Sequence, residues 1–400
     1  MASQRRRFLA LLTAALMGVA GSALAQDKPI KIALIASKTG PLETYARDTE
    51  RGLRLGLEYM TQGTMKVLGR RIDVIVKDDQ MKPELSKVLL TEAYADDRAD
   101  IAVGTSWSGG ALAMTPVAQE YKRLLFIDPA IADSLTGKDW NRYIFRAIRN
   151  TTQDAMAALA ALKEGDNLAF LAVDDLYGRD GVSALKDSLA RTKSKVKIAQ
   201  EEYVPVATTD FTAPMQRIFS AMDKQRSGRK YLVVIWRSPN PMRKLADLNP
   251  SRHGIEFMSI GGGNLETVKQ WKGIELNGGI FYFYTFPKNA MNDWLVKEHT
   301  KRYQVPPDMM TACGFMTAAA IVAGLNKAQS ADTEKLIAAM EGMEFDSPKG
   351  KAVFRRDDHQ AMQVQYHFKM KGSGTGEWDL LDLVKEIPAG DMQVPVTTRP

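Results

Sequence analysis

The chain has 400 residues, of which 45% are hydrophobic and 25% charged, as expected for a globular protein long enough for two cores. Basic residues exceed acidic residues by seven, and by four once a leader with three arginines is removed. So small and dispersed an excess argues against a nucleic-acid-binding protein. The single cysteine, Cys313, excludes an internal disulfide, and its apolar surroundings predict a buried helix.

Residues 1–25 are predicted to be a secretory signal peptide. Arginines at residues 5–7 precede an apolar run, and alanine at residues 23 and 25 fits a cleavage site before Gln26. The arginines fit either a twin-arginine signal or an ordinary charged n-region. No cysteine marks a lipid anchor, and no later segment approaches the ~20 apolar residues that span a bilayer. We therefore expect a soluble, monomeric protein exported to the periplasm.

Short β-rich runs alternate along the chain with longer segments of helical periodicity. We predict strands at residues 31–37, 71–79, 100–106, 124–130, 168–175, 231–237, 256–262 and 279–286. Helices are predicted between them, at 49–60, 85–97, 180–193 and 211–222, and after them, at 291–304, 311–328 and 333–343. Nearly continuous apolar strands that alternate with helices indicate parallel sheets covered on both faces. Ligands bind such sheets at the carboxyl ends of the strands.

The predicted fold class is α/β, with two doubly wound parallel sheets that form two lobes. The pattern breaks near residues 145–156, and helices that follow the eighth strand can return to the first lobe. We assign residues 27–147 and 287–345 to an N-terminal lobe, and residues 148–286 and 346–400 to a C-terminal lobe and tail. A chain that crosses between lobes more than once makes a hinge.

Motifs for catalysis are missing from the sequence. The segment "GTSWSGG" at residues 104–110 lacks the Gly-x-Ser-x-Gly spacing of a hydrolase nucleophile, and all four histidines are far from it in sequence. No Walker A loop, dinucleotide-binding glycine motif or His-Glu-x-x-His pattern is present. The acid pairs at residues 78–79 and 174–175 are better interpreted as capping and turn carboxylates. We expect a non-enzyme without cofactor or metal.

Five segments in one order carry a family resemblance. They are "SKTGPLETYA" at 37–46, residues 104–136, "YIFRAIRNTTQDA" at 143–155, "DDLYGRDG" at 174–181 and "DFTAPMQRI" at 210–218. From Ile30 to about Met370 the chain resembles the periplasmic solute-binding proteins of the Leu/Ile/Val-binding family, the receptor components of ABC importers. The resemblance implies a type I periplasmic binding protein fold, a ligand held between the lobes, and a membrane permease as partner.

The resemblance implies a carboxylate site around Ser108. This residue matches the family serine that takes the ligand carboxylate, and the predicted helix that it opens would favour an anion through its free N–H groups and dipole. Alternatively, Ser108 only caps that helix. Trp107 is either a wall for an apolar ligand or packing. Ala130, Ile131 and Ala132 match the segment that offers backbone groups, although Ala132 replaces the usual threonine and one donor is lost.

Aromatic residues are expected to line the cleft. Tyr45 and Tyr177 match family aromatics from opposite lobes. At the end of a strand, Trp236 could stack on a ring, and Arg237 could pair with a second carboxylate or a phenolate, or else be a solvated turn residue. The aromatic run at 281–286 lies around a predicted crossover. By strand periodicity half of its side chains face a core, and the others are candidates to enlarge the cleft, with Tyr284 and Phe286 nearest.

The ligand class follows from a missing acid. Family members that bind amino acids place a carboxylate for the ligand ammonium near Gly261, whereas this chain has glycine at 261–263 and no acid before Glu266. A buried ammonium without a counter-charge is costly, so we expect an aromatic or other non-amino-acid carboxylate. A branched-chain or hydrophobic amino acid is the alternative ligand. Two other functions stay open: an extracytoplasmic module that senses a ligand for a membrane signalling partner, and a hydrolase that uses Ser108.

Overall fold

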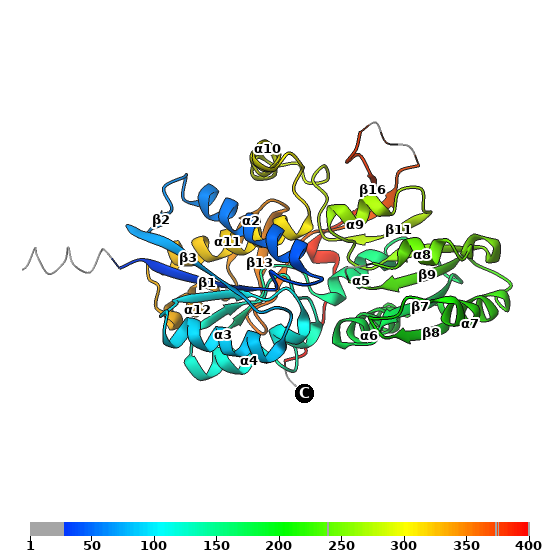
Figure 1. Ribbon diagram of the computed structural model, residues 1–400, viewed down its shortest axis with the longest axis horizontal. Helices are drawn as coiled ribbons and strands as arrows, with labels where there is room; N and C mark the ends of the chain where they lie inside the picture. Colours follow the sequence, from blue (N-terminus) through cyan, green and yellow to red (C-terminus); the bar gives the residue numbers. More distant parts are fainter. Residues whose placement is uncertain (1–27, 238–239, 373, 375, 399–400) are drawn as a thin grey trace, which may run out of the picture.

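The computed structural model describes residues 28–237, 240–372, 374 and 376–398. The expected signal peptide, residues 1–25, lies outside this part of the chain. Figure 1 shows two lobes side by side, each formed by a β-sheet with helices packed against it. The predicted α/β class with two mostly parallel sheets is confirmed.

The first lobe contains a six-stranded sheet in the order β2-β3-β1-β4-β5-β6. Its strands are β1 (Ile30–Ala36), β2 (Lys66–Val67), β3 (Arg70–Asp78), β4 (Ile101–Gly104), β5 (Leu124–Phe126) and β6 (Ile144–Phe145). All neighbours pair in parallel except β2 and β3. Strands β1, β4 and β5 are buried almost throughout, because helices cover both faces of the sheet.

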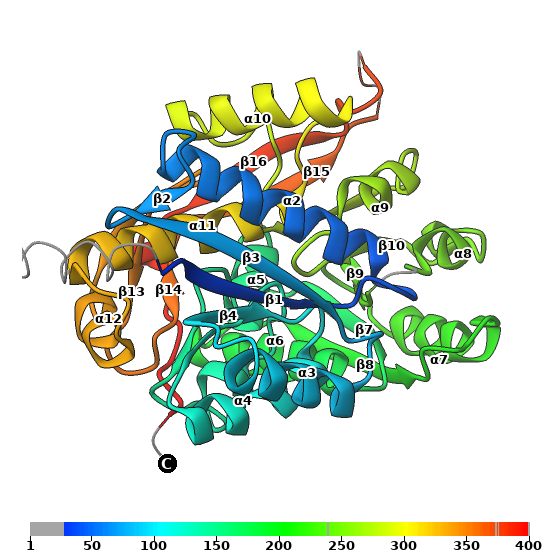
Figure 2. The same ribbon diagram turned by 60° about the vertical axis from the view of Figure 1, so that its left-hand side comes forward.

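Five helices complete the first lobe. They are α2 (Glu43–Met60), α3 (Pro83–Ala95), α4 (Ser108–Tyr121), α11 (Met309–Ala328) and α12 (Thr333–Met340). Helix α2 packs on α11, and α3 packs on α4 against the opposite face of the sheet (Figure 2). Gly52 permits the first contact, since a Cβ atom there would lie 1.9 Å from the Thr311 carbonyl oxygen. Helix α10 (Ala290–Tyr303) packs outside α2 and α11 through Leu295, Leu55 and Phe315.

Helix α11 corrects one expectation. Among the described residues it is the one helix long and apolar enough to cross a membrane, although we expected no such segment after the leader. Its side chains are mostly buried inside the first lobe, so it is a core helix. Cys313 is buried in it, as predicted.

The second lobe contains a seven-stranded sheet in the order β16-β15-β11-β10-β9-β7-β8. Its strands are β7 (Asn167–Val173), β8 (Lys197–Val204), β9 (Lys230–Ile235), β10 (Ile255–Ser259), β11 (Leu276–Ile280), β15 (Gln365–Met370) and β16 (Leu381–Ile387). Strands β15 and β16 are antiparallel additions at one edge. Helices α5 (Thr151–Leu159) and α6 (Leu176–Arg191) cover one face, and α7 (Thr212–Asp223), α8 (Met242–Ala246) and α9 (Leu265–Gln270) cover the other.

The chain crosses between the lobes after β6, after β11 and after a small sheet of β12 (Glu344–Ser347), β13 (Gly350–Phe354) and β14 (Ala361–Met362). The first and third crossings lie side by side, because Arg146 N–H donates to the His359 carbonyl and Ala361 N–H donates to the Arg146 carbonyl. The side chains of Phe354 and Ala361 pack in the first core. The third crossing therefore lies after residue 362, later than the expected boundary at 346.

The aromatic run at 281–286 corrects a second expectation. Strand β11 ends at Ile280, so the run is the second crossing and not a strand. Phe281 and Tyr282 pack in the core of the first lobe, whereas Phe283 and Phe286 pack in the core of the second. Tyr284 donates a hydrogen bond to the Trp378 carbonyl at 3.3 Å. Neither Tyr284 nor Phe286 lines the cleft, because the aromatic side chains join the two cores at the hinge.

Candidate functional site

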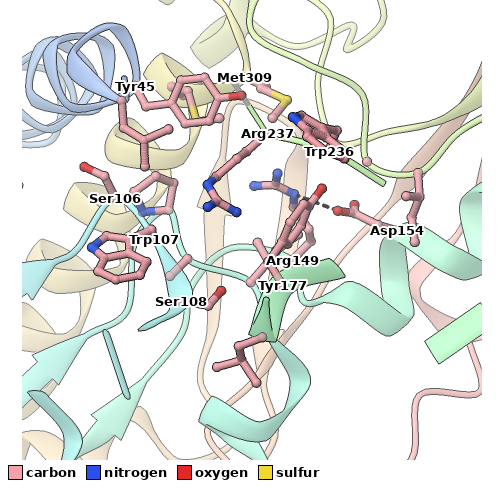
Figure 3. Close-up of a pocket in the computed structure, with 18 of the residues that line it drawn as sticks. Tyr45, Ser106, Trp107, Ser108, Arg149, Asp154, Tyr177, Trp236, Arg237 and Met309 are labelled. Atoms are coloured by element: carbon pink, nitrogen blue, oxygen red, sulfur yellow. Dashed lines mark hydrogen bonds and ion pairs between the residues drawn. The ribbon is translucent and has the colours of Figure 1, made fainter. Parts of the chain in front are cut away.

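A cavity of about 90 Å³ lies between the two lobes (Figure 3). On this measure one water needs roughly 10–15 Å³, so the cavity suits a small molecule. Its walls come from the carboxyl ends of β4, β5, β9 and β10 and from the first turns of α2, α4, α6 and α11. This is the place where a doubly wound sheet is expected to bind its ligand.

The lobes touch each other around this cavity. Asp133 N–H of the first lobe donates to the Asp180 carboxylate of the second. On another side, Asn264 Nδ2 donates to Thr44 Oγ1 at 3.2 Å, and Leu265 N–H donates to Asp308 Oδ2 at 3.4 Å. The structure is therefore a closed arrangement of the lobes.

Ser108 lies in the cavity wall at the start of α4. It is the first residue of the helix, whereas the N-cap is Trp107, so the alternative of a capping serine is wrong. Its Oγ accepts a hydrogen bond from Ala132 N–H at 3.3 Å. The N–H groups of the first helical turn have no carbonyl partner within the helix, and together with the hydroxyl they can receive an anion.

Trp107 acts as both wall and packing. It lines the cavity, and its ring lies over the start of α4, where a Cβ atom on Gly109 would approach it to 2.5 Å and one on Gly110 to 2.6 Å. The two glycines after Ser108 therefore make room for the indole. Trp107 Nε1 is buried and has no hydrogen-bond partner among the described residues.

The segment after β5 contributes Ala130 and Ile131 to the cavity, whereas Ala132 does not line it. The Ala132 N–H is used by Ser108. The Ile131 carbonyl accepts hydrogen bonds from the backbone and hydroxyl of Thr151 at the start of α5. This segment thus holds the start of α4 against the hinge.

Tyr45, Tyr177, Trp236 and Arg237 all line the cavity, Tyr45 from the first lobe and the others from the second (Figure 3). Trp236 is 6% exposed and packs edge-on against Phe211, with ring centroids 5.7 Å apart. Burial raises the pKa of the Tyr177 hydroxyl well above its usual value, so it stays protonated and can donate.

Arg237 is neither a solvated turn residue nor an unpaired cation. Its guanidinium forms an ion pair with Asp175, and its side chain is 13% exposed. Asp175 is also the N-cap of α6 and accepts from Gly178 N–H at 3.1 Å. Arg237 is therefore held by a residue of its own lobe, and it faces the cavity with its charge already neutralised.

Several further cavity residues were missed from sequence, among them Arg149, Asp154, Met309 and Met310. Arg149 Nε lies 3.3 Å from Asp154 Oδ2, and the two residues are 3% and 0% exposed. Burial raises the pKa of the Asp154 carboxyl, while the charges of Arg149 and Lys349 oppose that rise. Both polar residues lie in or just after the first crossing, and no local sequence pattern marks them as cavity residues.

Asp154 also corrects the inference drawn from Gly261. Gly261 lines the cavity with φ +80°, and a Cβ atom there would lie 2.3 Å from Asp154 Oδ2. A carboxylate from α5 thus occupies the space that a side chain at position 261 would enter. The cavity wall therefore contains an acid where the sequence indicated none.

Lys349 lies behind this ion pair. It is 5% exposed, and its Nζ is 3.7 Å from the centroid of the Phe281 ring. Within the described chain its Nζ has no hydrogen-bond partner. Burial, followed by the charge of Arg149, lowers the pKa of Lys349 well below its usual value.

Catalytic and metal-binding groups do not gather here. None of the four histidines lines the cavity. In residues 28–237, 240–372, 374 and 376–398 there is no cluster of three or more His, Cys, Asp or Glu side chains that could hold a metal ion.

Known proteins resemble this chain over most of its length. A family model described as periplasmic binding protein matches residues 29–375. The Leu/Ile/Val-binding protein BraC3 of Rhizobium johnstonii is 24% identical over 357 residues, which covers 86% of this chain and 93% of the relative.

Two solved structures, both from Rhodopseudomonas palustris, extend the comparison. The crystal structure of an ABC-type branched-chain amino acid transporter is 52% identical, covers 93% of this chain and 100% of that one, and has a TM-score of 0.82. A solute-binding protein of an ABC transporter in complex with 3,4-dihydroxy benzoic acid is 23% identical, with coverages of 91% and 98% and a TM-score of 0.76.

Proposed function

The chain belongs to the periplasmic binding protein family and is a solute-binding protein of an ABC transporter, a non-enzymatic role, and from this premise we propose that it captures a small carboxylate between its lobes. The observation that carries the proposal is the wall formed by Ser108, whose hydroxyl and helix N-terminus face an otherwise largely apolar cavity. Small-molecule sites combine apolar walls with a few placed polar groups in this way.

The mechanism that we propose is hinge closure. The first lobe receives the carboxylate at Ser108, and closure brings Tyr177, Trp236 and Arg237 of the second lobe over the ligand. Contacts such as Asp133 to Asp180 then form between the lobes. A ligand that binds the closed state better shifts the population toward it, and a membrane permease would recognise that state. Export to the periplasm by the leader at residues 1–25 is part of the same proposal.

For the ligand, we favour an aromatic or other non-amino-acid carboxylate. Two tryptophans and two tyrosines in the cavity walls support an aromatic ligand. The fold accommodates such ligands, since a relative binds 3,4-dihydroxy benzoic acid. A branched-chain amino acid is the second candidate because of the names that BraC3 and the 52% identical protein carry.

A thermal-shift screen with benzoate and cinnamate derivatives, aliphatic acids and amino acids tests this proposal. A ligand that binds only the folded protein raises the melting temperature. We expect carboxylates with an aromatic body to give the largest shifts. Tight binding of leucine or valine with no shift for any benzoate or cinnamate would refute the favoured ligand class.

Ser108→Ala separates carboxylate binding from general stability. A hydrogen bond to a charged group contributes about 1.5–3 kcal/mol, so the dissociation constant should rise about tenfold to a hundredfold. The control is Ser134→Ala, which removes another buried hydroxyl of the first lobe, one that has no partner among the described residues and does not line the cavity. It should leave affinity unchanged. Equal affinities of both variants would overturn the role of Ser108.

A further inference from the structure

The buried ion pair of Arg149 and Asp154 uses only part of the Asp154 carboxylate. Oδ2 faces Arg149 Nε at 3.3 Å. Oδ1 is buried and has no hydrogen-bond partner among the described residues. Asp154 is 0% exposed and belongs to the cavity wall, so this oxygen is shielded from bulk solvent. Buried polar atoms are nearly always hydrogen-bonded, and the missing donor therefore points to a bound molecule.

The position of Asp154 separates it from the carboxylate site. In Figure 3, Ser108 and Asp154 lie on different sides of Tyr177, and a dashed line joins Arg149 to Asp154. A ligand whose carboxylate is held at Ser108 would thus present another part of its body to Asp154. Gly261 leaves room for the Asp154 carboxylate in the cavity wall, because a Cβ atom there would lie 2.3 Å from Asp154 Oδ2.

The surrounding charges favour a neutral donor over a cationic one. The Asp154 charge is already balanced by Arg149, and Lys349 is close enough to act electrostatically on both groups. An ammonium group placed at Asp154 would add a positive charge beside the Arg149 guanidinium in a region of low dielectric. A hydroxyl group would satisfy Oδ1 without adding charge.

We propose that Asp154 Oδ1 accepts a hydrogen bond from a neutral hydroxyl group on the ligand body, and that the receptor thereby selects hydroxylated carboxylates. Arg149 is a positioning residue, since it holds the other carboxylate oxygen. This inference rests on the proposed function, because it takes the ligand carboxylate to be bound at Ser108.

Ligands that differ in one group test the inference on the unmodified protein. Isothermal titration compares para- and meta-hydroxybenzoate with the matching methoxybenzoates and with benzoate. A second series compares the hydroxy-acid analogue of leucine with leucine itself and with its deaminated analogue. We expect at least one hydroxylated acid to bind tenfold or more tightly than its methoxy or unsubstituted counterpart, and more tightly than the ammonium-bearing acid.

Two variants connect this preference to Asp154. Asp154→Asn keeps the shape of the side chain, and the double variant Arg149→Met with Asp154→Leu removes both charges, so that no buried charge is left unpaired. We expect both to lose the tenfold preference for hydroxylated acids, measured within each variant as the ratio of the dissociation constants of the unsubstituted and the hydroxylated acid. The control is Asp166→Asn, which alters another buried carboxylate of the second lobe, paired with the exposed Arg229 outside the cavity, and should keep the preference.

The outcomes distinguish the two proposals. If carboxylates bind and depend on Ser108 while hydroxyl groups make no difference, the inference about Asp154 fails and the proposed function stands. A stronger preference for the ammonium-bearing acid, or a preference that persists in both Asp154 variants, also overturns it. If no carboxylate binds at all, both proposals fail together.

Discussion

Asp154 and Gly261 meet in the wall of the interlobe cavity, where a Cβ atom on residue 261 would lie 2.3 Å from Asp154 Oδ2. The two residues come from different elements of the second lobe, the first turn of α5 and the loop after β10. Asp154 therefore enters the cavity wall from the hinge side. Its carboxylate takes the space that a side chain at position 261 would need, so only glycine fits there.

Gly261→Ala should weaken ligand binding tenfold or more. A side chain at φ +80° costs about 1–2 kcal/mol by itself, and the methyl group must also displace the Asp154 carboxylate. The matched control is Gly273→Ala, at φ +84° with no atom within 4 Å of the new Cβ. Both variants should lower the melting temperature by similar amounts, because both place a side chain at positive φ. Titration should show reduced ligand affinity in Gly261→Ala alone. Equal affinity would mean that the contact has no part in binding.

Asp180 should make lobe closure depend on pH. Burial and the charge of Asp133 raise the pKa of Asp180 to about 6 in the closed protein, against about 3.9 for an exposed aspartate. A raised carboxyl pKa favours the closed form fully below about 4, and this contribution is lost as the pH rises through about 6. Wild-type affinity should therefore be up to about tenfold tighter near pH 5 than near pH 7.

The comparison with Asp180→Asn removes effects of ligand protonation, because both proteins bind the same ligand. The asparagine can still accept from Asp133 N–H, and its affinity should vary less over this range. Asp187→Asn, on the exposed face of the same helix, should behave as the wild type. Parallel pH profiles of the wild type and Asp180→Asn would contradict the prediction.

Lys349→Met should stabilise the protein at neutral pH by about 1 kcal/mol or more, since it removes a buried amine without a partner in the described residues. The lowered pKa of Lys349 also makes the stability depend on pH, because the unfolded chain binds a proton at this amine that the folded chain does not. Wild-type stability should therefore rise relative to the variant as the pH approaches about 10, the pKa of an exposed lysine.

Denaturant titrations at several pH values measure this difference in unfolding free energy. Lys351→Met provides the control, because Lys351 is exposed, two residues away and paired with Glu344. Its stability should follow the wild-type pH dependence. A loss of stability in Lys349→Met would show that the buried amine is needed in its charged form.

The sequence predicted the continuous apolar strands well, and it missed β6, which has two residues, and β15, which mixes polar and apolar residues. Strands such as β1 and β7 are continuous apolar runs that mark a parallel sheet. Strand β8 was missed because its sequence, KIAQEEYV, is largely polar at the edge of the sheet. The aromatic run at 281–286 has strand-like composition, and composition cannot distinguish a strand from a crossing whose side chains fill two cores.

The candidate site followed the same division. Ser108, Tyr177 and Trp236 could be predicted from the family resemblance and from their places at strand ends, because parallel strands bring their carboxyl ends together. Arg149 and Asp154 could not, because they enter the cavity from the hinge and the turn of α5 that follows it. Their role depends on how the first crossing packs against the loop after β10, which no local pattern encodes.

One measurement tests the central claim most directly: isothermal titration of the best carboxylate from the screen against its own carboxamide. The two compounds share size and shape, but only the acid has a charge for Ser108 and the start of α4 to receive. We predict that the carboxylate binds at least tenfold more tightly and that Ser108→Ala removes most of this difference. Equal binding of acid and amide to the wild type would contradict a carboxylate receptor.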